Sequence, residues 1–573
     1  MSLKGRRHSF AIWPVPIISQ ADFVEIDATP TLSDRPLIFR EDSFDATTRV
    51  RRGGLWSSFD GCPKRTRLGA PASACVLGPE GLVQVRPIRE KQTVLRELDE
   101  RGLFWRPEER IPKNAYAPDS CVAGTLKIDR DGNIGLELDN LLPRPNGVPP
   151  SKNALADRFP IIGILKSSKS YIRLEEVWPR KLQLNPRSPS YQVFGSYVCI
   201  ISSAPILASS SKAYCSEIRL SLEGYEQWLE LGEAKVKTTR RGVTAQYGRP
   251  MSHIFKLADG LLTIDTVLTV TANDPFASAA MSQQPFLTYK PRKPQTLDGV
   301  RELFSQLEDL LILLTDSERG LPNPNVKIKR QRGWATIYFT RRPRPEGEIT
   351  AFNSWVILSQ LGTDFGDVVD RWFAKHEEYG PAFHLYLGCR RGTQLYLEHR
   401  FVNLIWGLES LHRQVADPAD KSALDAKIAR ILTAVPAGKD RTWLKGQLKR
   451  AGDPALADRL LDLIQRLPLP LDRKQVVGFA TTCAARRNEI SHQGGHRRHS
   501  GYNQWVVGLH PLSNALDRLY HALILMEIGV PSDRIQAIFQ ASYTAFTIRQ
   551  DLHAVGITLA SAVPKPTAKP STL

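Results

Sequence analysis

The sequence predicts an α+β multidomain protein, in which a β-rich N-terminal domain is followed by an all-α helical bundle. Two observations predict this fold class: apolar and polar residues alternate in short runs before about residue 345, and apolar residues recur at helical spacing after about residue 350. A length of 573 residues allows roughly three or four domain-sized units. We therefore expect an irregular N-terminal extension over 1–95, a β-rich domain over 96–345, a helical domain over 350–555 and a disordered tail over 556–573.

The two ends of the chain lack a sustained hydrophobic period. In 1–95, proline and glycine recur, and the clearest candidate strand is the short run 82–85. Whether this extension folds is left open by its sequence. The tail carries Pro564, Pro566 and Pro570 within a few residues, a composition typical of disorder.

The region 96–345 has the alternation of half-buried strands. Its clearest element is a hairpin, in which the strands 124–128 and 134–138 are joined by Asp131-Gly132, a dipeptide typical of tight turns. Helices are expected at 222–231 and at 300–315, and in the second of these ranges apolar residues recur at helical spacing. Further strands are expected at 160–165, 171–174, 192–198, 261–270 and 334–340.

The region after residue 350 has the period of amphipathic helices. Helical spacing is clear over 365–373 and 395–411, and longer patterned segments run over 471–485 and 512–528. Gly529 and Pro531 are typical of the end of a helix. The segment 439–450 is basic, and we expect it to be exposed.

Charge gives the first indication of function. The 77 Lys and Arg residues exceed the 59 Asp and Glu residues, so the formal net charge is +18. Such an excess favours contact with polyanions, of which nucleic acid is the commonest in cells, although a solvated basic face would have the same composition. No apolar run reaches the roughly 20 residues of a membrane span, and neither a secretory signal nor a disulfide or zinc pattern of cysteines is present. We expect a soluble, cytoplasmic protein.

The most informative motif lies in the stretch 484–495, AARRNEISHQGG. The apolar residues before it predict a helix, and the glycine pair is a natural end for that helix. Asn488 and His492 are four residues apart and share a helix face. Arg487 lies five residues before His492, about 140° round the helix, an angle that a long guanidinium side chain can partly cover.

These residue types are suited to the cleavage of RNA. A guanidinium binds a phosphate with two hydrogen bonds and can stabilise charge that develops on it. An imidazole titrates near neutral pH and can take a proton from a ribose 2′-hydroxyl or give one to a leaving oxygen. An amide can orient either group. Together they suffice for cleavage without a metal or cofactor, in a reaction that needs the 2′-hydroxyl and excludes DNA.

The spacing by itself is not specific. A second Arg-x4-His occurs at Arg371 and His376, where Trp372 and Phe373 indicate core packing instead. For Arg487 and His492, the alternative interpretation is a pair of cations at the C-terminal end of a helix, where basic residues are favoured. The spacing leaves these two interpretations open.

The motif Arg487-Asn488-x3-His492 resembles the R-N-x3-H signature of the HEPN superfamily of ribonucleases, and the closest resemblance is to its ApeA-like anti-phage group. The stretch 406–412 is similar to the helix that carries an acidic residue in that group, and 523–529 is similar to its closing helix. Short motifs in the front half resemble the ApeA N-terminal domain; they lie at 102–105, 124–126, 131–132, 136–138 and 228–229. The resemblance covers roughly 98–550.

The resemblance implies a metal-independent endoribonuclease that acts in anti-phage defence by abortive infection. Arg487 and His492 would be the catalytic pair, Asn488 would support them, and Glu409 would be the acidic partner, unless Glu409 is an ordinary exposed helix glutamate. The family also implies a two-fold homodimer with an isologous interface. The β-rich domain would sense an unknown phage-derived trigger or keep the nuclease silent.

Residues near the motif have more than one interpretation. Arg486, Arg497 and Arg498 could line a path for RNA, or they could belong to a solvated loop. The histidines at 492, 496 and 499 have a spacing compatible with a metal, but no carboxylate or cysteine cluster joins them, so we predict none.

Two other function classes remain. One is a non-catalytic HEPN module that binds nucleic acid or a partner protein. The weaker one is a basic DNA-binding regulator, for which the sequence has no helix-turn-helix or zinc-finger pattern.

Overall fold

The computed structural model describes most of the chain from residue 98 to residue 559, together with one short hairpin before it. The described residues are 75–78, 81–84, 98–143, 159–183, 190–206, 213–232, 234–248, 252–274, 278–341, 349–391, 395–416, 422–448, 451–493 and 502–559. The chain divides into two units, 1–90 and 91–573. In the first unit the described residues form a hairpin of β1 (Cys75–Gly78) and β2 (Gly81–Gln84), and β2 lies where the candidate strand was expected.

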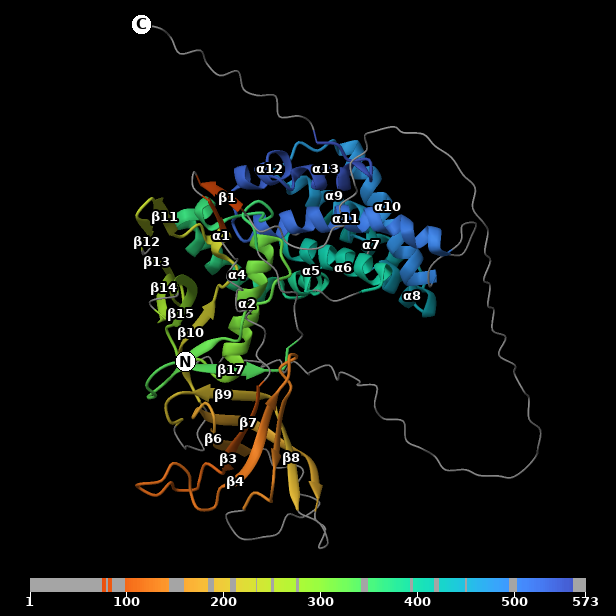
Figure 1. The fold of residues 1–573 in the computed structure, drawn as a ribbon. Helices are drawn as coiled ribbons and strands as arrows, with labels where there is room; N and C mark the ends of the chain where they lie inside the picture. Colours follow the sequence, from red (N-terminus) through yellow and green to blue (C-terminus); the bar gives the residue numbers. More distant parts are fainter. Residues whose placement is uncertain are drawn as a thin grey trace, which may run out of the picture. The chain divides into compact units, whose positions relative to one another are not determined.

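Six strands of the second unit close into an antiparallel barrel, whose strands run from orange to yellow in Figure 1. The barrel closes because its longest strand, with 13 residues, pairs with one neighbour along its first half and with another along its second half. Inward-facing apolar side chains alternate with exposed ones and fill the interior. In order round the barrel, the strands are β3 (Leu98–Trp105), β4 (Val122–Ile128), β5 (Ile134–Leu138), β8 (Tyr191–Ser196), β7 (Tyr171–Gln183) and β6 (Phe159–Leu165).

The sheet continues beyond the barrel, because the first half of β7 also pairs with β9. The further strands, in spatial order, are β9 (Val198–Ser202), β17 (Ala335–Phe339), β16 (Asn325–Ile328), β10 (Cys215–Ser221), β15 (Ser278–Pro291), β14 (Gly260–Asp274) and β13 (His253–Leu257). A separate ribbon is formed by β11 (Ala234–Thr239) and β12 (Gly242–Tyr247). The expected strand 192–198 is in fact two strands, β8 and β9, because the chain changes partners at Tyr197.

The front region also contains a short helix, α1 (Glu226–Leu229), and a long one, α2 (Leu297–Thr315). Helix α1 lies within the expected range 222–231, and α2 begins three residues before the expected range 300–315 and ends with it. Thr296 caps α2, since its side-chain oxygen accepts a hydrogen bond from the Gly299 N–H. Nearly every residue of the second half of α2 is buried, so this helix is a core element.

After residue 350 the described elements are helical, which confirms the predicted fold class. They are α3 (Leu358–Leu361), a 3-10 turn (Gly362–Asp364), α4 (Phe365–Tyr379), α5 (Pro381–Arg390), α6 (Leu397–Val415), α7 (Ser422–Ala434), α8 (Lys439–Leu448), α9 (Leu456–Arg466), α10 (Arg473–Gln493), α11 (Tyr502–Glu527), α12 (Ser532–Gln540) and α13 (Ala545–His553). The tail was expected to begin at residue 556, but Leu559 still forms an isolated bridge with Leu471. The rest of the expected tail, from residue 560 onward, lies outside the described ranges. Across the described ranges, no helix combines the length and the apolar character that a membrane span requires.

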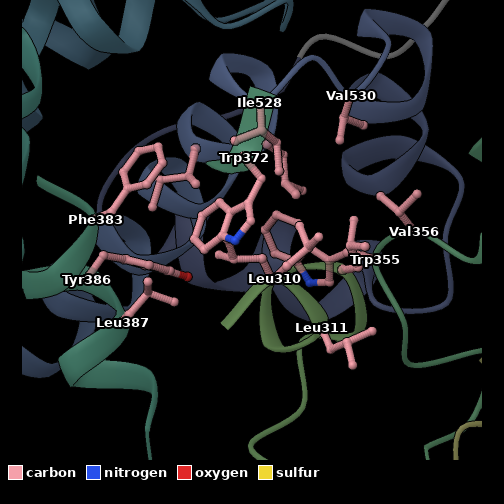
Figure 2. Close-up of a cluster of buried hydrophobic side chains, with 14 of the residues drawn as sticks. Leu310, Leu311, Trp355, Val356, Trp372, Phe383, Tyr386, Leu387, Ile528 and Val530 are labelled. Atoms are coloured by element: carbon pink, nitrogen blue, oxygen red, sulfur yellow. The ribbon is translucent and has the colours of Figure 1, made fainter. Parts of the chain in front are cut away.

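The front and helical regions share one hydrophobic core. Figure 2 shows Trp372 of α4 among side chains of α2 and α5, together with Ile528, which directly follows α11. The Trp372 indole N–H donates a hydrogen bond to the Gln306 carbonyl of α2 at 2.9 Å, and its ring stacks on Phe383 with the centroids 5.4 Å apart. Trp105 and Trp228 are also buried, whereas Trp178 is only partly buried.

Candidate functional site

The motif lies near the C-terminal end of α10, which is helical from Arg473 to Gln493 as its pattern predicted. The predicted apolar face is buried, and it includes Phe479 and Cys483. Arg487 lies one turn beyond Cys483 on this face, because residues four apart follow each other along a helix. Its side chain is 21% exposed, so the guanidinium reaches the boundary between the bundle and the solvent.

Glu409 of α6 lies opposite Arg487. The Glu409 Oε2 atom is 3.6 Å from the Arg487 Nη2 atom, and the Glu409 side chain is 19% exposed. The two residues are 78 positions apart in sequence, and the packing of α6 against α10 brings them together. This geometry places Glu409 beside the motif rather than on a fully solvated face.

Glu409 is shared by three guanidinium groups. Its Oε1 atom accepts a hydrogen bond from Arg413 at 2.7 Å, one turn further along α6, and lies 3.8 Å from Arg459 Nη1. Arg459 belongs to α9, and its side chain is 9% exposed, so it needs this carboxylate and the Pro454 carbonyl to which it donates at 2.9 Å. Three positive charges therefore surround one negative charge, and the site attracts anions.

Asn488 contacts the guanidinium of its neighbour. The Asn488 Oδ1 atom accepts a hydrogen bond from Arg487 Nη1 at 3.2 Å. The Arg487 Nε atom is buried and has no hydrogen-bond partner within the described ranges. A guanidinium has five N–H donors, so Arg487 keeps donors that the contacts with Glu409 and Asn488 do not use.

Arg486 points to a different partner. Its Nη1 atom donates to Glu489 Oε2 at 2.8 Å, and the Trp505 indole N–H of α11 donates to the same oxygen at 3.1 Å. With 39% of its side chain exposed, Arg486 remains accessible to an anion, and its contact with RNA stays a prediction.

His492 occupies the last turn of α10, four residues after Asn488 on a continuous helix. The backbone therefore has the relation that the motif predicted. The side chain of His492 lies outside the described set, as do Arg497, Arg498 and the histidines at 496 and 499. The searched residues include no group of three His, Cys, Asp or Glu side chains arranged to hold a metal, so the absence of a metal at His492 stays a prediction.

A second polar pair, which the sequence did not indicate, lies one turn beyond Glu409. The His412 Nε2 atom is 3.4 Å from Asp462 Oδ2 of α9, and His412 is buried. Arg466 donates to the same carboxylate at 3.0 Å and to the Val415 carbonyl at 2.8 Å. Burial lowers the pKa of His412, an effect that Asp462 opposes, so the folded structure favours the neutral imidazole.

Helix α9 is also the source of the site residue that sequence reasoning missed, Arg459. Leucine and isoleucine recur at helical spacing over 456–464, and this pattern could have identified the helix. No sequence pattern indicates that Arg459 would face Glu409, because that contact depends on how α9 packs against α6.

The second Arg-x4-His has the packing role expected of it. Trp372 is buried, and the His376 ring lies 5.0 Å from the Trp372 ring and 4.9 Å from the His384 ring. Burial, with the nearby charges of His384 and Arg391, lowers the pKa of His376 to about 4.

Comparisons with known proteins identify two regions of the chain. The family model of the ApeA N-terminal domain 1 matches residues 100–372, and the model of the Apea-like HEPN domain matches residues 402–534. Neither the curated proteins nor the solved structures give a match to the chain. The first range covers nearly all of the barrel and all of α2, and the second covers most of α6 and all of α9 and α10 with their arginine-rich site. Both matches stand in the order that the sequence motifs indicated, and they confirm the resemblance to ApeA-like HEPN proteins.

Proposed function

We propose that this chain is a metal-independent HEPN endoribonuclease that acts in anti-phage defence by abortive infection. The observation that carries the proposal is the setting of Arg487, which lies between Glu409 and Asn488 with donors left over. The helix that holds it also carries His492 one turn beyond Asn488. Near the end of one helix there are thus a cation that could bind a phosphate and an imidazole that could take up a proton.

The reaction is a transfer within the RNA strand. The Arg487 guanidinium binds the scissile phosphate, and His492 takes the proton of the adjacent 2′-hydroxyl. The 2′-oxygen then forms a bond to phosphorus while the bond to the 5′-oxygen breaks, and that oxygen leaves with a proton. The products are a 2′,3′-cyclic phosphate and a 5′-hydroxyl. Glu409 and Asn488 orient Arg487, and a second motif in a two-fold homodimer would supply the proton to the leaving oxygen.

The β-rich region is the proposed sensor of a phage-derived trigger. The hydrophobic core that α2 shares with α4, α5 and α11 supports this role. A conformational change in the front region can reach the helical region through these packed side chains. The proposed setting is the cytoplasm, where both a phage-derived trigger and cellular RNA are present.

The test is an incubation of the purified full chain with single-stranded RNA in the presence of a chelator. The wild-type chain should give fragments with cyclic phosphate ends, and the double variant Arg487→Ala, His492→Ala should lose cleavage by at least about 100-fold, as expected when a general base is removed. Arg534→Ala, at an exposed arginine of α12, is the matched control. Undiminished cleavage by the double variant would refute the assignment of the catalytic pair.

The same incubation distinguishes the alternative function. If the wild-type chain binds the RNA and leaves it intact under every trigger condition that activates defence, the HEPN domain is a non-catalytic binding module. The retention of Arg487, Asn488 and His492 together favours the nuclease, because a binding scaffold has no need of a titratable imidazole beside the cation.

A further inference from the structure

The helices α7 and α8 form a hairpin over 422–448 that differs from the rest of the helical region. None of the residues in these two helices is buried. By contrast, α9 has only 11 residues and buries four of them. The two helices contact each other, and the large aliphatic residues of the hairpin are partly exposed rather than buried. The hairpin therefore contributes little to the core and presents most of its surface to its surroundings.

The surface of the hairpin is basic. Within 422–448 there are five Lys and Arg residues and two Asp residues, so the formal charge is +3. The cations are Lys427, Arg430, Lys439, Arg441 and Lys445. A positive helical hairpin is suited to a polyanionic partner, whereas a second copy of this chain would carry the same net charge of +18.

An exposed tryptophan lies in the middle of this basic surface. Trp443 of α8 is 65% exposed, which is unusual for so large an apolar ring. It lines a shallow groove together with Gly438, Lys439, Thr442, Gly446 and Gln447. The two glycines have open space where a side chain would be, so neither of them covers the indole ring.

Helix geometry places a cation and an amide beside the ring. Lys439 is one turn before Trp443 and Gln447 one turn after it, so all three share a face of α8. Lys445 is two residues from Trp443, about 160° away round the helix. An aromatic ring with a neighbouring ammonium is the combination that binds a single-stranded nucleic acid, since the ring stacks on a base and the cation pairs with a phosphate.

The chain connects this hairpin to the candidate site at both of its ends. Helix α6, which carries Glu409, ends at Val415, and α7 begins at Ser422. Seven residue steps span at most about 25 Å when fully extended. After α8, the chain enters α9, whose fourth residue is Arg459. The start of the hairpin therefore lies within about 25 Å of the end of the helix that carries Glu409.

We propose that the α7–α8 hairpin is an RNA-binding arm of the nuclease, in which Trp443 stacks on an unpaired base and Lys439 binds an adjacent phosphate. The substrate that fits it is a single strand or a loop, because the bases of an A-form duplex are stacked on each other and are not open to an indole ring. This inference rests on the proposed RNA substrate. The arm holds the strand, and the cluster around Arg487 receives its scissile phosphate.

The test measures binding separately from cleavage. In the full chain with His492→Ala, the affinity for a fluorescein-labelled oligouridylate is measured by fluorescence anisotropy over a range of salt concentrations. Adding Trp443→Ala should weaken binding about tenfold, the effect of losing one stacked base, whereas Trp443→Tyr should retain most of the affinity. Tyr543→Ala, at another exposed aromatic residue, is the control for the loss of a ring and should have no effect.

A matched pair of charge variants tests the role of the groove. Lys439→Gln and Lys445→Gln remove the same charge from the same helix, but only Lys439 lines the groove with Trp443. Lys439→Gln should weaken binding more and should reduce the slope of log affinity against log salt by about 0.7, as expected for one phosphate contact on a single strand. Thermal melting should be unchanged in all hairpin variants, because none of these residues is buried.

Three results would overturn the proposal: unchanged affinity in Trp443→Ala, equal effects of Lys439→Gln and Lys445→Gln, or a Trp443→Ala chain that changes its oligomeric state in light scattering while binding RNA normally. The last result would assign the hairpin to an interface between two copies. The nuclease proposal fails independently, if the wild-type chain binds RNA through Trp443 and does not cut it.

Discussion

Glu409 is the residue on which the geometry of the candidate site depends. Its two carboxylate oxygens lie within 4 Å of guanidinium nitrogens from three helices, those of Arg413, Arg459 and Arg487. Without the carboxylate, these three cations would repel one another, and Arg459 would be a largely buried charge without its ion-pair partner. Glu409 therefore acts through Arg487 as a positioning residue.

Replacing Glu409 tests this role. Glu409→Gln should lower kcat for RNA cleavage by about 10- to 100-fold, because a displaced guanidinium no longer meets the phosphate in the reactive geometry. KM should change little, since the surrounding arginines still attract RNA. Glu409→Asp should lie between the variant and the wild type, and Glu378→Gln at an exposed glutamate of α4 is the control. A lower melting temperature with unchanged kcat would assign Glu409 a purely structural role.

At the residue scale, the sequence predicts the helix of the motif and the order of its residues, since both follow from local periodicity and spacing. The resemblance to ApeA-like proteins adds Glu409, which spacing alone cannot connect to Arg487. Arg459 and the pair of His412 with Asp462 could not be predicted, because these contacts form only when α9 packs against α6.

The end of α2 is the element that joins the front region most closely to the helical bundle. Asp316 follows the last residue of α2 with a φ of +52°, a conformation that Asp and Asn adopt more readily than most residues. Its carboxylate accepts a hydrogen bond from the guanidinium of Arg390 in α5. The same carboxylate lies 3.2 Å from Arg518 Nη1 and 3.5 Å from His521 Nδ1. Burial would raise the pKa of Asp316, but Arg390, His521 and Arg518 outweigh it and hold this pKa well below its usual range.

This buried ionic cluster predicts a large effect of a small substitution. Asp316→Asn keeps the shape and the backbone preference but leaves Arg390 and Arg518 without their central anion, so it should lower the free energy of unfolding by about 3–5 kcal/mol. The exposed pair on the same helix gives the control, as Asp298→Asn should change it by less than about 1 kcal/mol. Denaturant unfolding monitored by circular dichroism measures both variants, and equal effects would contradict the account.

At the scale of elements, the sequence predicts the strands that alternate clearly, such as 124–128 and 134–138. It does not predict β15, although this strand has 14 residues, because Pro285 lies in its middle and its first half carries Ser278, Ser282, Gln283 and Gln284. It also reads β8 and β9 as one strand. Closing the barrel needs β7 to change partners along its length, and this is a long-range property with no local signal.

The stability of the whole molecule should depend on pH through the histidines of α4 and α5. Burial and the charges of His384 and Arg391 lower the pKa of His376 to about 4, against about 6.5 in an unfolded chain. The neutral form is therefore favoured on folding. The contribution of neutral His376 to the free energy of unfolding is fully present above about pH 6.5. It is lost as the pH falls towards 4, and the total loss is up to about 3 kcal/mol.

The measurement is thermal melting of the full chain between pH 7 and pH 4.5. His376→Gln should reduce the loss of stability on acidification, because glutamine binds no proton in the unfolded state. His553→Gln, at an exposed histidine of α13, should retain the wild-type pH dependence. If His376→Gln melts with an unchanged pH dependence, another group is responsible for the acid sensitivity.

The unit 91–573 joins a β-rich front region, which matches the ApeA N-terminal domain 1, and a helical region, which matches the Apea-like HEPN domain, through one core. The sequence predicts both regions and their order, because each has its own hydrophobic period. The shared core could not be predicted, since the residues that build it, such as Leu310 and Trp372, have the same pattern as the core of a separate domain.

The central claim is that Arg487 and His492 cut RNA through its own 2′-hydroxyl. The most direct measurement is mass spectrometry of the products from an RNA strand and from the same strand with 2′-O-methyl riboses, both incubated with the wild-type chain and a chelator. The account predicts 2′,3′-cyclic phosphate ends from the first strand and no cleavage of the second. Equal cleavage of both strands, or 2′,3′-cyclic phosphate ends that persist with Arg487→Ala, His492→Ala, would contradict it.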